Sequence, residues 1–288
     1  MSYLSVLTAL RSVAGQVSIP EAKGFPSISR VLLEILTREG SASPNTGIDA
    51  LLAAVLVGMS VSSLRPGPGL LTKTGFIFDL SAVDCGGVGL SFDSLVTNYS
   101  AAQTIEISLN GLTNCPFVRF PVLTSLQNGG DFIDVESSDI ATFSCPVLTT
   151  MVVPASGGGI FLFDNANLTN VDFPVLQTCG EFDLFNCDAL TTLSLPQLVT
   201  AGFFFVGDNA ALTSVSLPNW VPTDGASYWF FDCALNVTSV NAILVACAAT
   251  MTTGGNIRLE GGTSAAPTGA GAAAKATLIA NGVTVTTN

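Results

Sequence analysis

One feature constrains the fold of this chain more than any other: an apolar residue or Cys followed by Pro recurs between residues 120 and 220. The successive prolines are 25, 28, 22 and 22 residues apart, and Leu stands two places after each of the first four. The five prolines are Pro121, Pro146, Pro174, Pro196 and Pro218. A period of this length is typical of one turn of a solenoid, whose turns must stack to bury a continuous core.

The repeats also share an internal order. Each passes from Pro-x-Leu through a small residue into an aromatic strand, turns at Asn or Cys, and closes with a short Leu-Thr segment. We call the turn position the turn slot; it holds Asn165, Cys187, Asn209 and Cys233. A buried Asn there would satisfy backbone groups along the turn, and Cys can fill the same slot as a small hydrophobe.

Two runs carry a resemblance to a known family: 187–196 (CDALTTLSLP) and 209–218 (NAALTSVSLP). They resemble leucine-rich repeats of the receptor-L-domain or bacterial-surface type. The tail over residues 240–288 is similar to the C-terminal cap of repeat proteins from bacteriophage and environmental bacteria. The resemblance covers roughly residues 120–288 and implies a binding or virion-structural role, with no catalytic residues to transfer. Asp134 departs from the pattern, because an inward apolar residue is expected at its position.

We therefore predict a mainly β fold: a leucine-rich-repeat-like β-solenoid with a helical N-terminal module and an α/β C-terminal cap. The predicted domains are 1–69, 70–238 and 239–288. The first is read as helical from its apolar spacing, and either caps the first turn or docks the chain to an assembly. In the tail we expect helices over 239–251 and 269–280 and strands over 256–260 and 283–287, which would cover the open edge of the last turn.

Composition excludes several classes of site. The chain has no His, which rules out His-based nucleophile activation and His-ligated metals. Its seven Cys show no metal-binding spacing and are read as small buried hydrophobes, with disulfides between neighbouring turns as the alternative. The formal net charge is -12, and Arg119 is the one basic residue between positions 74 and 256. Nucleic-acid binding is therefore not expected. We also predict no cofactor.

Alternation along each aromatic strand separates an inward set from an outward set. Positions three and five before the turn slot are expected in the core: Leu162, Ile160, Leu184, Phe182, Val206, Phe204, Phe230 and Tyr228. Positions two and four before it should point outward, and six of those eight are aromatic. This predicted outward aromatic stripe is Phe161, Phe163, Phe185, Phe205, Trp229 and Phe231.

An exposed stripe of this kind usually marks an interface. We predict that it packs against another copy of the chain, with a trimer favoured, or against a different chain. The alternatives are cover by the same chain, a register shift of one residue that would swap the two faces, or a glycan stacked on Phe205 or Trp229.

Carboxylates are the only candidate catalytic groups. Asp131, Asp134, Glu136 and Asp139 cluster in one turn, where a Ca²⁺ site is a further hypothesis. Asp164, Asp183 and Asp208 lie near the aromatic strands, and paired carboxylates can hydrolyse glycosides. Acidic residues at turns are more commonly solvated, so we predict a protein that is not an enzyme.

The resulting prediction is a structural or adhesive virion component of a bacteriophage, such as a fibre, spike or tail part. It would be made in the host cytoplasm without a signal peptide and would not insert into membranes, because the apolar run over 48–61 is too short to span a bilayer. Its partners would be further copies of itself, other virion proteins through the N-terminal module, and a host receptor or glycan. The alternatives are a bacterial surface adhesin and a carboxylate-based polysaccharide hydrolase.

Overall fold

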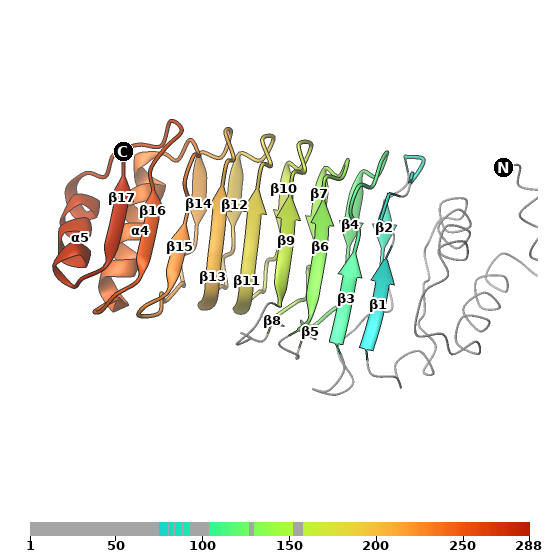
Figure 1. Cartoon of the computed structure of the whole chain (residues 1–288), viewed down its shortest axis with the longest axis horizontal. Coiled ribbons are helices and arrows are strands. Elements are labelled where there is room, and N and C mark those ends of the chain that lie inside the picture. The colour runs from blue at the N-terminus through green and yellow to red at the C-terminus, as the bar shows by residue number, and fades with distance from the viewer. Residues whose placement is uncertain are drawn as a thin grey trace, which may run out of the picture.

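The computed structural model describes residues 75–79, 81–82, 84–87, 89–92, 104–126, 130–151 and 158–288. The predicted helical module over residues 1–69 lies outside these residues. In the described part the fold is mainly β and its strands pair in parallel. The strands lie side by side in chain order along an elongated stack, with the helices of the described part at its C-terminal end (Figure 1).

An 11-stranded parallel sheet forms one side of the stack, and we call it the main sheet. Nine of its strands form an unbroken series in which spatial order follows chain order, so the chain returns to the sheet once per repeat. The strands of this order are β1 (Gly75–Asp79), β3 (Thr104–Ser108), β6 (Phe132–Glu136), β9 (Gly159–Phe163), β11 (Thr178–Phe185), β13 (Thr200–Gly207), β15 (Ser227–Trp229), β16 (Asn256–Leu259) and β17 (Thr284–Thr287). The short strands β5 (Ser125–Leu126) and β8 (Thr150–Met151) join it through β11.

Shorter parallel strands form two further sheets. The first contains β2 (Leu90–Ser91), β4 (Phe117–Arg119), β7 (Thr142–Ser144) and β10 (Asn170–Asp172), and the second contains β12 (Thr192–Ser194) and β14 (Ser214–Ser216). The strands β10, β12 and β14 arise from the Leu-Thr segments that close the sequence repeats. From β1 to β14, each repeat therefore supplies one strand to the continuous order of the main sheet and one to the two sheets behind it (Figure 1).

The core is built from the same repeat positions. The Leu of every Pro-x-Leu unit is fully buried: Leu123, Leu148, Leu176 and Leu198 are all 0% exposed. Three buried rings near the prolines contact one another from repeat to repeat. Phe120 and Phe173 directly precede a proline, and Phe143 lies three residues before Pro146. The ring centroids of Phe120 and Phe143 are 6.0 Å apart, and those of Phe143 and Phe173 are 5.7 Å apart. Removal of these side chains from water is the main favourable term that holds the repeats together.

The turn slots form a buried hydrogen-bonded column. The Asn209 side chain accepts from the backbone N–H of Cys187 at 2.8 Å and donates to the Leu184 carbonyl at 2.9 Å. Asn165 repeats these contacts with the Ser138 N–H and the Val135 carbonyl, at 3.0 and 2.7 Å. Each slot Asn thus satisfies two backbone groups of the preceding repeat, which confirms the predicted role.

Cysteine occupies the alternate slots. The Cys187 thiol donates to the Leu162 carbonyl at 3.5 Å and is hydrogen-bonded by the backbone of Asn165. All seven cysteines are buried and free, so the expectation of small buried hydrophobes is confirmed. Burial raises the pKa of the Cys187 thiol to about 12 and that of Cys233 to about 11.

The residue before each slot adopts a left-handed backbone conformation, a feature that sequence reasoning missed. None of these residues is Gly; they are Asp164, Asn186, Asp208 and Asp232. Ser137 stands in the same place before Ser138, which fills the turn slot of the repeat that contains β6. All five have φ between 49 and 55°. Asn and Asp tolerate this conformation better than other non-glycine residues because their short polar side chains can bond locally. Here the Asn186 amide donates to the Asp164 carboxylate at 2.7 Å, so this column is also linked between repeats.

The tail agrees with the sequence prediction to within two residues at each end. Helices α4 (Val237–Thr250) and α5 (Gly269–Ala280) alternate with β16 and β17, and both strands extend the main sheet. Helix α4 packs beside β14 and covers its edge, where the Ser239 hydroxyl accepts from the Val215 N–H at 3.0 Å. Neither of the two helices in the described part of the chain has the length and apolar character that crossing a bilayer requires.

Candidate interaction surface

The outer face of the main sheet, which points away from the core, carries the side chains with the greatest potential for binding. In-register pairing aligns them into rows that cross the strands. What we call the middle row is Asp134, Phe161, Asp183, Phe205, Trp229 and Arg258. A second row, which we call the upper row, holds Glu136, Phe163, Phe185 and Gly207, and continues past the strand ends through Phe231 and Glu260.

The predicted division between inward and outward residues is confirmed. The eight inward side chains are all 0% exposed, whereas the six residues of the predicted aromatic stripe are each half-buried. The register shift of one residue that would have swapped the faces is therefore excluded. Asp134 needs a correction: it does not occupy an inward position, because Ile133 and Val135 on either side of it are the buried residues of β6.

The outward rings contact one another across four strands. Phe161 and Phe163 are 6.1 Å apart between ring centroids, Phe163 and Phe185 are 5.7 Å apart, and Phe185 and Phe231 are 5.9 Å apart. On the middle row the Phe205 and Trp229 rings approach to 4.6 Å. Aromatic pairs at such distances are favourable beyond their area burial, so these rings form one continuous band.

Gly207 makes room for this band. A Cβ atom at Gly207 would lie 2.6 Å from the Phe231 ring and 2.8 Å from the Phe185 ring. The absent side chain therefore allows two rings from non-adjacent strands to meet over β13. Sequence reasoning also missed Phe203, which is 46% exposed and lies 5.8 Å from Phe205. The same alternation, counted one step further from the turn slot, would have found it.

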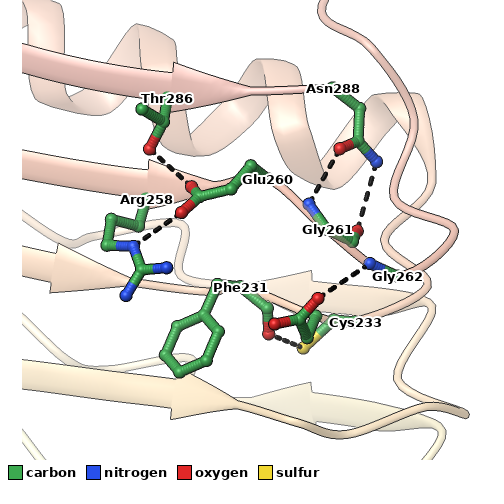
Figure 2. Close-up of polar contacts among 9 residues, drawn as sticks. Phe231, Cys233, Arg258, Glu260, Gly261, Gly262, Thr286 and Asn288 are labelled. Atoms are coloured by element: carbon green, nitrogen blue, oxygen red, sulfur yellow. Dashed lines mark hydrogen bonds and ion pairs between the residues drawn. The ribbon is translucent and has the colours of Figure 1, made fainter.

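Arg258 closes one end of the band, and Figure 2 shows it beside Phe231 and Glu260. Its guanidinium carbon lies 4.3 Å from the centroid of the Phe231 ring and 5.4 Å from that of Trp229. The Nε–H of Arg258 donates to the Glu260 carboxylate at 2.6 Å, and the Thr286 hydroxyl donates to the other oxygen of that carboxylate. The face thus already holds one guanidinium group by ring faces and a carboxylate.

Asp183 lies within the band and is the residue most out of place on a sheet face. It is 8% exposed, with Phe161 and Phe205 as its neighbours along the middle row. Among the described residues its Oδ1 atom has no hydrogen-bond partner. Burial, with a smaller contribution from the charge of Glu181, raises the pKa of Asp183 to about 7. An ionised carboxylate here lacks the partner that a buried charge normally has.

The other acidic residues singled out from the sequence serve separate structural contacts. The buried Asp131 carboxylate accepts from the Ile105 N–H at 2.7 Å, and Asp134 accepts from the Asn110 amide at 2.8 Å. Asp139 accepts from the backbone N–H of Asn114 at 3.4 Å. Within the described residues, no three Asp, Glu, Cys or His side chains gather as metal ligands would. The hypothesis of a Ca²⁺ site in this turn therefore has no structural support.

The structure thus brings all six predicted stripe residues together on one face and adds Phe203, Asp183 and Arg258 to them. Asp164 and Asp208 lie instead in the left-handed column beside the turn slots.

Compared with models of protein families, with curated proteins and with solved structures, the chain gives no match.

Proposed function

We propose that this protein is a leucine-rich-repeat-like β-solenoid with a structural and adhesive role, and that its copies associate through the outer face of the main sheet. The observation that carries the proposal is the continuous band of half-buried rings from Phe161 to Phe231. Aromatic residues are enriched at protein interfaces, and a contiguous apolar patch on a free surface marks a binding site.

The solenoid part of the proposal is supported by regularity. Successive main-sheet strands pair in parallel and in register, as between Phe182 and Phe204, which are 22 residues apart. The slot side chains link each repeat to the one before it. Stability in such an array comes from contacts between neighbouring repeats, which is the pattern of hydrogen bonds and ring contacts described above.

The resemblance to repeat proteins of bacteriophage extends the proposal to a virion fibre, spike or tail component. In that setting the module over residues 1–69 would attach the chain to other virion proteins. The outer face would then hold several copies together.

One observation favours a second candidate, a carboxylate-based polysaccharide hydrolase. Glu181 and Asp183 are two residues apart on β11 and therefore share the outer face, among rings on which sugars could stack. Burial raises the pKa of both carboxyls, that of Asp183 to about 7, which suits a general acid. This candidate predicts polysaccharide cleavage that is lost in Asp183→Asn and retained in Asp188→Asn, whose carboxylate is exposed in a turn.

The mass of the purified full chain in solution tests the main proposal. We expect wild type to form a closed oligomer and Phe205→Asp/Trp229→Asp to be a soluble monomer, because two charges would then have to be buried in the contact. The matched control is Val245→Asp/Ile279→Asp, which alters two exposed apolar side chains of α4 and α5. This control should keep the wild-type mass. A monomeric wild type at micromolar concentration would overturn the proposal.

A further inference from the structure

The middle row of the outer face has a self-complementary charge order. Read from β11 to β16 it runs acid, ring, ring, base: Asp183, Phe205, Trp229 and Arg258. The same four residues read in the opposite direction run base, ring, ring, acid. A second copy turned end for end therefore presents each residue type with its complement.

We infer that two copies pair outer face to outer face about a twofold axis that runs parallel to the strands, between β13 and β15. In this arrangement Arg258 of each copy reaches the recessed carboxylate of Asp183 on the other. The inference rests on the proposed self-association and names its geometry. Twofold contacts are isologous, so one acid–base pair necessarily occurs twice.

Charge selects this axis over the other way of placing the faces together. A twofold axis perpendicular to the strands would keep the strand order and bring Asp183 against Asp183 and Arg258 against Arg258. Like charges in contact at an interface cost several kcal/mol and act against the wrong pairing. Reversal of the strand order instead places Phe205 of each copy opposite Trp229 of the other, so four rings lie at the centre of the contact.

Both charged groups have bonding capacity left for such a partner. Asp183 is nine-tenths buried, and its Oδ1 has no hydrogen-bond partner among the described residues. Arg258 uses its Nε–H for Glu260, and within the described residues its two Nη groups donate to no acceptor (Figure 2). The buried Trp229 Nε1 also lacks a partner in this part of the chain. Charge-assisted hydrogen bonds from a second copy would satisfy the carboxylate.

The burial that raises the pKa of Asp183 fits the same arrangement. A guanidinium group within hydrogen-bond distance favours the ionised carboxylate and would lower that pKa again. The remaining acid of the middle row does not oppose the contact. Asp134 lies on β6, four strands before the axis, whereas the sheet extends only three strands beyond it, so a reversed second copy ends before it reaches Asp134.

Sedimentation equilibrium on the full chain tests the inference by charge exchange. Wild type should be a dimer. Asp183→Arg and Arg258→Asp should each weaken it by at least about a hundredfold, because each replaces two attractive pairs with two repulsive ones. An equimolar mixture of these two variants should form dimers again, since both contacts then join opposite charges. The double variant Asp183→Arg/Arg258→Asp should also dimerise.

Two further variants guard against indirect effects. Asp183→Asn preserves the side-chain shape and should weaken dimerisation about tenfold, the effect of a charge removed without a repulsive one added. Asp188→Arg makes the same charge change as Asp183→Arg at an exposed turn and should leave the dimer intact.

The outcomes separate this inference from the proposed function. A wild-type trimer or other ring would overturn the twofold pairing and leave self-association standing. Failure of the mixed variants to dimerise, when each alone has the wild-type circular dichroism spectrum, would also overturn the pairing. A monomeric wild type would overturn both.

Discussion

Substitution of the buried slot residue Asn209 gives the sharpest test of how the repeats are held together. Its side chain satisfies the Cys187 N–H and the Leu184 carbonyl, and it is 0% exposed. Asn209→Ala leaves both backbone groups unpaired in a site that has no access to solvent. At about 1–3 kcal/mol for each unpaired buried group, the free energy of unfolding should fall by about 2–6 kcal/mol.

The chain itself supplies a graded comparison. Cys occupies the neighbouring slots at positions 187 and 233, where the thiol fills the space and makes weaker hydrogen bonds. Asn209→Cys should therefore lose roughly half as much stability as Asn209→Ala, about 1–3 kcal/mol. Asn167→Ala is the matched control, because Asn167 is exposed and makes one long contact of 3.4 Å with Asp139; we expect a change within about 0.5 kcal/mol.

Two measurements read out the effect. Urea unfolding gives the change in stability, and native-state hydrogen exchange should show a selective loss of protection at the Cys187 amide, the group that Asn209 accepts from. If Asn209→Ala costs less than about 1 kcal/mol, the hydrogen-bond argument for the slot column is wrong. If Asn209→Cys, which refills the space, costs nothing while Asn209→Ala does, the side chain only fills space and the argument is wrong as well.

Three other predictions follow from the described contacts. All seven thiols should stay unreactive toward a thiol-specific chromogenic reagent in the native protein and react together on unfolding, because all are buried; fast reaction of several thiols without unfolding would contradict this. Gly207→Ala should lower the melting temperature by an amount equivalent to about 1–3 kcal/mol, because the added Cβ would collide with the Phe231 and Phe185 rings. The control Ser216→Ala, at an exposed position, should leave the melting temperature unchanged. In dilute monomer the folded-state pKa of Asp183, about 7, exceeds its unfolded value, so the folded state binds more protons. The free energy of unfolding should therefore fall as the pH rises from about 4 to 7, and this part of the slope should be absent in Asp183→Asn.

Sequence reasoning placed the inward and outward side chains correctly because one position anchors each repeat. An Asn or Cys at a fixed turn sets the count along the strand, and alternation then assigns every residue of the strand to one face. The tail elements were predictable for a similar reason: the Ala-rich run over residues 269–280 and the alternating strands beside it are local patterns.

The features that sequence reasoning missed depend on contacts between repeats. Asp134 was misplaced because its repeat has Ser138 in the slot, where the hydroxyl accepts from the Leu112 N–H at 3.0 Å. Because that turn holds neither Asn nor Cys, the sequence offers no position from which to count back to the inward and outward residues of β6. The burial of Asp183 is set by rings on the strands to either side. Arg258 contacts the Trp229 and Phe231 rings only because β16 pairs with β15. Helix α4 separates these two strands in the sequence, so no local pattern reveals the contact.

The in-register pairing of β11 and β13 makes the length of this molecule a separable property. Residues 187–208 form one complete period: if they were removed, Asn186 would be joined to Asn209, and a left-handed residue would again precede a slot Asn. The stack would become shorter by one strand spacing, about 4.8 Å, and its cross-section would not change. Duplication of the same segment would lengthen it by the same step. Loss or duplication of whole repeats in the gene can therefore change the length of the stack in small fixed steps, while every remaining repeat keeps the same core.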